Sequence, residues 1–238
     1  MIVLGMNPQD LVKEYERDYD EMCDLISADL LSRIGKIKKI YSRTKSPIPV
    51  IDRKLKIRGT NYIIPIRDIT EPDDVYKSNI LIHPYIITND KVTGNKVVLF
   101  FINMCHDYKE ITIPIVIEPH LLSRYRERFL KKEPGTISYE ELASMFLKRN
   151  RSFFNLSYSS VFDDNGKVID VRTMSKVVDG VVFGRIEPNG LVRFLTYINH
   201  KLVRESDQKE YLKGEHFDNN IEFFKDPEMI SFDIIKYF

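Results

Sequence analysis

The segment from Asn7 to Ser42 has the pattern of one long amphipathic helix, and it constrains the fold more than any other feature. Asn7 suits the N-cap position and Pro8 the first helical turn, where a missing N–H costs nothing. Apolar residues then recur every three or four positions, at Leu11, Tyr15, Tyr19, Met22, Ile26, Leu30, Ile34, Ile37 and Tyr41. A helix of this length exceeds about 45 Å, so its apolar stripe must lie on a sheet or on another subunit.

Two prolines mark where this helix ends, and basic residues precede them. Pro47 and Pro49 cannot continue the helix, and a break near Gly35 is a second option. The basic residues are Lys36, Lys38, Lys39, Arg43 and Lys45. We interpret them as cations that complement the negative C-terminal end of the helix dipole.

Composition places the chain among folded proteins without a dominant charge. Of its 238 residues, 43% are hydrophobic, and the formal net charge is +1. A nucleic-acid partner would therefore have to be held by a local basic patch. We expect Cys23 and Cys105 to be buried free thiols, which fits a cytoplasmic location. The sequence shows neither a signal-peptide pattern nor an apolar run of membrane-helix length, so we expect no leader and no membrane partner.

The rest of the chain combines short strand patterns with a central helix pair, which predicts an α+β fold with mixed or antiparallel strands. The first strand patterns lie at residues 50–57, 62–69, 79–88, 96–104 and 110–117. The helix pair covers about 120–132 and 138–150, and the second helix starts with a capping box of Ser138 and Glu141. The last strand patterns predict a four-stranded antiparallel C-terminal sheet, at 153–162, 167–173, 181–186 and 191–199.

We divide the chain into two parts near residue 109. Residues 1–109 hold the long helix and the first strands and can be continuous with the rest, whereas residues 110–238 form an α+β module. This module ends in a short helix over 206–212 and an acidic, aromatic-rich tail from Glu215 to Phe238. The tail carries too much apolar surface to leave in water, so we expect it to dock on the body.

One predicted helix face combines an imidazole with two guanidinium groups. Pro119 starts this helix, and His120, Arg124 and Arg128 follow at spacings that place them on one stripe. Such a stripe can bind a phosphate and move a proton. It is equally the pattern of an ordinary solvated helix face. The opposite, apolar side should pack on the C-terminal sheet, and it holds Leu121, Leu122, Tyr125 and Phe129.

A second pair of arginines comes from the last predicted hairpin. Pro188-Asn189-Gly190 suits a three-residue turn closed by a glycine in the left-handed region. This register places Arg185 directly opposite Arg193 on one sheet face. Facing like charges are destabilising, so either the pair holds an anion or each arginine pairs with an acid such as Glu187 or Glu205.

The sequence contains no motif of the common metal-binding, nucleotide-binding or hydrolase classes. The histidines show no pair at metal-ligand spacing, and they are His83, His106, His120, His200 and His216. We therefore expect no metal site. We also expect no cofactor, because the sequence has no phosphate-binding loop, dinucleotide fingerprint or nucleophile elbow. His200 ends the strand of Arg193 and is a second candidate acid or base.

The order of these elements resembles a nuclease family. A strand leads into the helix Pro119-His120-Leu121-Leu122-Ser123-Arg124-Tyr125-Arg126-Glu127-Arg128. The later sheet ends in Arg193-Phe194-Leu195-Thr196-Tyr197-Ile198, and a polar helix with Gln208 follows. Over about residues 110–212 this resembles the barnase–EndoU–colicin–RelE-like nucleases of phages and mobile elements. Those nucleases often pair an H-x3-R-x3-R helix with a strand that ends in an R-x-x-T pattern.

The resemblance implies a toxin-like, metal-independent endoribonuclease, in which a ribose 2′-OH attacks its own phosphate. His120 would be the general acid or base, and Arg124, Arg128 and Arg193 would stabilise the charged transition state. Thr196 completes the family pattern, although strict alternation places it on the sheet face opposite Arg193 unless a bulge intervenes.

The resemblance implies that four further residues bind the substrate. Tyr125 or Tyr197 would stack on an RNA base or donate a proton, and Arg185 and His200 would contact the substrate. A toxin of this kind would also have an antitoxin or an immunity protein as its partner.

The alternative hypothesis is a non-enzymatic interaction module of a mobile element, in which the arginine stripe only solvates a helix. The two hypotheses differ in geometry. Catalysis needs His120, Arg124 and Arg193 to converge in an open cleft. In the alternative, they diverge or pair with acids.

Overall fold

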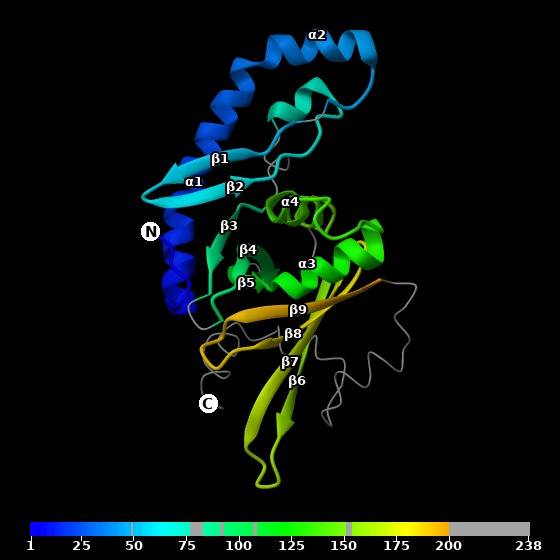
Figure 1. The fold of residues 1–238 in the computed structure, drawn as a ribbon. Helices are drawn as coiled ribbons and strands as arrows, with labels where there is room; N and C mark the ends of the chain where they lie inside the picture. Colours follow the sequence, from blue (N-terminus) through cyan, green and yellow to red (C-terminus); the bar gives the residue numbers. More distant parts are fainter. Residues whose placement is uncertain (49, 77–82, 91–92, 107–108, 151–153, 200–238) are drawn as a thin grey trace.

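A computed structural model gives the fold (Figure 1), and it describes residues 1–48, 50–76, 83–90, 93–106, 109–150 and 154–199. His200, the predicted helix over 206–212 and the tail from Glu215 to Phe238 lie outside the described residues. The fold is α+β, as predicted, and the described residues form four α-helices and one mixed sheet of nine strands. None of the helices in this part of the chain has the length and apolar character needed to cross a bilayer.

The elements follow the sequence patterns closely, with shifts at their ends. The helices are α1 (Pro8–Ser32), α2 (Ile34–Thr44), α3 (Pro119–Tyr125) and α4 (Tyr139–Arg149), with a 3-10 turn η1 (Pro72–Tyr76) and a π-helical turn η3 (Arg126–Leu130). The first strands are β1 (Arg53–Ile57), β2 (Thr60–Ile64), β3 (Tyr85–Asn89), β4 (Lys96–His106) and β5 (Lys109–Ile117). The last strands are β6 (Phe154–Phe162), β7 (Val168–Val177), β8 (Gly180–Ile186) and β9 (Val192–Asn199).

One parallel contact joins the two halves of the sheet. The strand order is β1-β2-β3-β4-β5-β9-β8-β7-β6, and of its neighbouring pairs only β5 and β9 run parallel. The four predicted C-terminal strands do pair antiparallel, as β6–β9, but they form one end of the nine-stranded sheet and not a four-stranded sheet of their own. Local patterns reveal hairpins, but they do not reveal which distant strands lie side by side.

The long N-terminal helix is present, but it is split in two. The Asn7 side chain caps α1 by accepting the Asp10 N–H at 2.8 Å, and Pro8 occupies the first turn as predicted. Arg33 leaves the helical region with φ −103° and ψ 1°, and α2 starts at Ile34. The break lies at Arg33, two residues before Gly35, near which the sequence allows a break.

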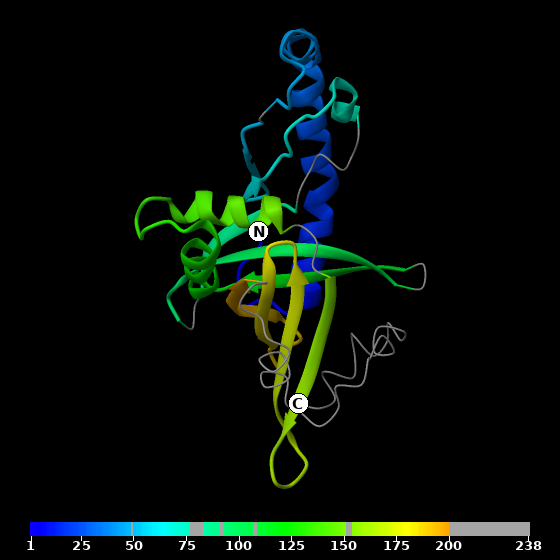
Figure 2. The ribbon, with the colours of Figure 1, turned by 90° about the vertical axis from the view of Figure 1, so that its right-hand side faces the viewer.

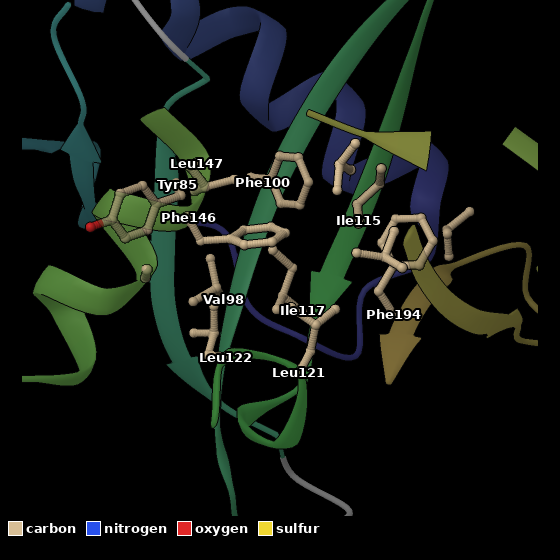
Figure 3. Close-up of a cluster of buried hydrophobic side chains, with 14 of the residues drawn as sticks. Tyr85, Val98, Phe100, Ile115, Ile117, Leu121, Leu122, Phe146, Leu147 and Phe194 are labelled. Atoms are coloured by element: carbon tan, nitrogen blue, oxygen red, sulfur yellow. The ribbon is translucent and has the colours of Figure 1, made fainter. Parts of the chain in front are cut away.

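Helices cover both faces of the central strands. In β4, Val97, Leu99 and Phe101 belong to the core beneath α1, whereas Val98 and Phe100 belong to the core beneath α3 and α4. Figure 3 shows this second core, where side chains from β4, β5, β9, α3 and α4 pack together. The β6–β7 hairpin extends beyond the helices (Figure 1). On α1, the Cys23 thiol is free and half-buried, so burial is less complete than predicted.

Candidate functional site

The candidate site begins where β5 runs into α3. Glu118 is still extended, and its N–H donates to a β9 carbonyl at 3.0 Å. Pro119 then opens α3, as predicted. Leu121 and Tyr125 are 0% exposed and pack toward β9, which confirms the expected burial of the apolar side. His120, on the other side of the helix, is exposed.

The side chains of the predicted histidine–arginine stripe take different partners. Arg124 Nε donates to His120 Nε2 at 3.3 Å, and its Nη1 donates to Glu127 Oε2 at 3.0 Å. Arg128 lies in the π-helical turn η3, and its Nη1 donates to the Tyr197 carbonyl of β9 at 2.9 Å. The guanidinium of Arg128 therefore binds the sheet backbone and does not join His120 and Arg124.

The β8–β9 hairpin has the predicted register. Arg185 and Arg193 lie directly opposite each other. Gly190 has a φ of 87°, and its N–H donates to the Glu187 carbonyl at 2.8 Å, which closes the three-residue turn. The turn residues alone were sufficient to place the two arginines on one face.

A bulge in β9 changes the position of Thr196. Phe183 pairs with Thr196, but the next residue, Gly184, pairs with the residue before Leu195, so Leu195 has no partner across the hairpin. One extra residue restores Thr196 to the sheet face of Arg193. Strict alternation alone would have placed Thr196 on the opposite face, and the bulge reverses this.

Arg193 is 7% exposed and is held by three carboxylates. Its Nη1 donates to Asp90 Oδ2 at 2.7 Å and also to Glu118, and its Nε donates to Glu187 Oε1 at 2.6 Å. Burial lowers the pKa of the guanidinium, but the hydrogen bond to Glu118 and the charge of Glu187 outweigh it and raise the pKa overall. Pairing with an acid is thus confirmed for Arg193. We call these four residues the Arg193 cluster.

Sequence reasoning named only one of these three acids. Asp90 and Glu118 are separated from Arg193 by 103 and 75 positions, and they come from the end of β3 and the end of β5. The only local signal concerned Glu118, which precedes a helix-starting proline, where an acid complements the helix dipole.

A cavity of about 510 Å³ opens beside the Arg193 cluster, between α3, the N-terminal segment and the β8–β9 turn. His120, Arg185 and Arg193 line it, whereas Arg124 and Thr196 do not. The three carboxylates of the cluster line the same cavity, so acids outnumber arginines there. Because like charges repel, this lining disfavours a phosphate group.

Tyr125 and Tyr197 cannot stack on an RNA base as predicted, because both are 0% exposed. The Tyr125 hydroxyl donates to Asp179 Oδ2 at 2.8 Å, and the Tyr197 hydroxyl donates to the Asp179 carbonyl at 2.6 Å. Burial first, and the neighbouring Asp179 second, raise the pKa of both hydroxyls well above the ordinary value. Both tyrosines therefore stay neutral and hold the core together.

Asp179 is buried and lies at the centre of a network with Tyr125, Tyr197, Arg149 and Asn150, which we call the Asp179 group. Arg149 donates to both of its carboxylate oxygens, at 2.9 and 2.8 Å, and Asn150 Nδ2 donates at 3.1 Å. The Asp179 N–H donates back to Asn150 Oδ1 at 2.9 Å. The group ties α3, α4 and β9 to the turn between β7 and β8, and no sequence pattern indicated it.

The Asp179 group should make folding stability depend on acid pH. Burial raises the pKa of Asp179, but the hydrogen bonds from Arg149 and Tyr125 outweigh it and hold the pKa below its ordinary value. A lowered folded-state pKa stabilises the fold above the unfolded-state pKa, and this stability is lost as pH falls below about 4. We expect Asp179→Asn to cost about 2–3 kcal/mol at pH 7 and to flatten this decline, measured by urea unfolding.

The exposed Asp164 provides the control for that experiment. Asp164→Asn removes a carboxylate from the β6–β7 turn and should leave the acid-pH decline unchanged. If Asp179→Asn declined in stability as steeply as the unmodified protein, the proposed linkage would be excluded.

The remaining predicted residue, His200, lies outside the described part of the chain. Within that part, no group of three or more His, Cys, Asp or Glu side chains could hold a metal ion. Comparison of the chain with protein-family models, with curated proteins and with solved structures gave no match. The nuclease resemblance and its catalytic roles therefore stay predictions.

Proposed function

We propose that this chain is a non-enzymatic interaction module. The Arg193 cluster carries the proposal. An arginine that stabilises a transition state must direct its charge at the developing negative charge of the substrate. Arg193 instead directs its donors at Asp90, Glu118 and Glu187, and it lies in a cavity where acids are in excess.

The arrangement of the other candidate residues supports the same proposal. Arg128 is bound to the β9 backbone, and the aromatic rings of Tyr125 and Tyr197 are buried. Of the residues needed for catalysis, His120 is the one that favours a ribonuclease, because it is exposed and lines the cavity. An experiment on His120 therefore separates the two functions.

The deciding experiment is an RNA cleavage assay without divalent metal, on the full chain and on His120→Ala. We expect the RNA to stay intact with both proteins. His83→Ala is the matched control, since it removes an imidazole that does not line the cavity. General acid–base catalysis contributes about 10²- to 10⁴-fold to a rate. Cleavage that falls by this factor in His120→Ala and survives in His83→Ala would overturn the proposal.

A further inference from the structure

The segment from Arg33 to Lys45 carries six cations and no acid, in a chain whose net charge is only +1. All six are exposed, and they are Arg33, Lys36, Lys38, Lys39, Arg43 and Lys45. From this segment we propose that α2 is a docking surface for the phosphate backbone of a nucleic acid. The inference rests on the proposed interaction function and names the class of its partner.

The helix dipole accounts for only two of these six charges. Because the N-terminal helix breaks at Arg33, the cations no longer sit at the end of one long helix. Lys36 lies in the first turn of α2, where the positive end of the dipole disfavours a cation, whereas Arg43 in the last turn and Lys45 at the C-cap lie at the favourable end. Our sequence-based interpretation as dipole-complementing residues is therefore wrong for most of the segment. Cations that do not stabilise their own helix are more readily explained by binding to a partner.

Few acids neutralise α2. Within the described residues, Arg33 pairs with Asp29 at 2.7 Å, but Lys36, Lys38, Lys39 and Arg43 form no ion pair. Lys45 lies over the Tyr41 ring, with Nζ 5.5 Å from its centroid.

The turn η1 packs on α2 and contains two acids, Asp73 and Asp74. Asp74 already accepts hydrogen bonds from Thr70 and from the Glu71 N–H, at 2.5 to 3.0 Å. Asp73 remains as the second acid of this turn, and it is exposed. Two carboxylates in the neighbouring turn are outnumbered by the six cations of the segment, so the local field stays positive.

Three of the cations form a row on the exposed side of α2. Ile37 is buried against the body, and Lys36, Lys39 and Arg43 follow i, i+3, i+7 spacing on the opposite side. This row spans about 10 Å of helix. Figures 1 and 2 place α2 at one end of the molecule, beside the end of α1 and the turn η1. A row of cations on an open surface complements the repeated negative charges of a nucleic-acid backbone.

The apolar side of α2 favours a nucleic acid over a membrane surface. A helix that lies on a bilayer inserts its apolar side among the lipids. In α2 that side is used by the protein, because Ile37 is 7% exposed and Ile34 packs in the core beneath α1. A partner that offers dense charge and needs no apolar contact fits better.

The test compares two triple variants of the full chain. Lys36→Gln, Lys39→Gln and Arg43→Gln together remove the row, and glutamine has nearly the same helix propensity as lysine and arginine. The control carries Lys132→Gln, Lys167→Gln and Lys176→Gln, which remove the same charge from exposed positions elsewhere. Circular dichroism verifies that both variants fold.

Binding is measured by fluorescence anisotropy with a short DNA duplex and a short RNA strand, over a series of salt concentrations. Each lost phosphate contact lowers the slope of log K against log salt by about 0.7–0.9. We therefore expect the α2 variant to lose about 2–3 units of slope and at least about tenfold in affinity at low salt. We expect the control variant to keep both.

Three results would overturn the inference. They are an unchanged slope in the α2 variant, an equal loss in the control variant, and binding to anionic lipid vesicles without binding to either oligonucleotide. Cleavage of the RNA strand, with α2 still required for binding, would instead refute only the non-enzymatic function. The two proposals therefore fail in different ways.

Discussion

Arg193→Ala is expected to destabilise the protein by about 3–5 kcal/mol, because it leaves a group of carboxylates without their cation. Asp90 is 3% exposed, and Glu118 and Glu187 lie beside it around the guanidinium. Urea unfolding monitored by circular dichroism measures the loss as a lower midpoint.

Arg185 offers a matched control for this substitution. It lies opposite Arg193 in the hairpin but is exposed, so Arg185→Ala should change stability by no more than about 0.5 kcal/mol. Adding Asp90→Asn to Arg193→Ala should recover part of the loss, because it removes one unpaired charge. A loss below about 1 kcal/mol in Arg193→Ala would show that the cluster does not stabilise the fold. Arg193 would then again be a candidate for binding a ligand.

Gly184→Ala is expected to cost more than about 3 kcal/mol or to prevent folding. Gly184 lies opposite the β9 bulge, and an added Cβ would collide with the Arg193 carbonyl oxygen and with the Phe194 backbone. Both obstacles are main-chain atoms in a paired strand, so they cannot move without opening the β8–β9 pairing. Thermal unfolding and the yield of folded protein measure the effect.

Gly35→Ala is the same chemical change at an open position. No atom lies within 4 Å of the Cβ that it would add, and alanine favours a helix by about 1 kcal/mol over glycine. This variant should therefore raise the unfolding midpoint, in the opposite direction to Gly184→Ala. Should Gly184→Ala unfold within a few degrees of the unmodified protein, the close approach at the bulge would be disproved.

Features that depend on a few neighbouring residues could be predicted from the sequence. The Asn7 cap is one example. The capping box is a second, because the Ser138 hydroxyl accepts the Glu141 N–H at 3.2 Å and the Glu141 carboxylate accepts the Ser138 N–H at 3.0 Å. The turn at Gly190 is a third, and it fixed which arginines face each other. In each case the interacting groups lie within about five positions, so local chemistry determines the result.

The features that prediction missed depend on contacts between distant segments. The identity of the acids around Arg193 follows from the pairing of β5 with β9, which no hairpin signal announces. Tyr125 and Tyr197 are buried because their rings pack together in the core, and both hydroxyls bind Asp179, which is 54 and 18 positions away from them. A sequence motif places a side chain on a face of its own element. It does not say what the rest of the chain brings to that face.

The parallel contact between β5 and β9 also sets an order for assembly. Strands β1 to β5 pair with their neighbours in sequence, and so do β6 to β9, so each set closes short loops. The β5–β9 contact joins only Ile115–Ile117 to Val192–Phe194, and it closes a loop that contains α3, α4 and three strands. Loop-closure entropy makes such a non-local contact slow to form. Arg193 and Glu118 meet only across this seam, so their cavity exists only once both halves are complete.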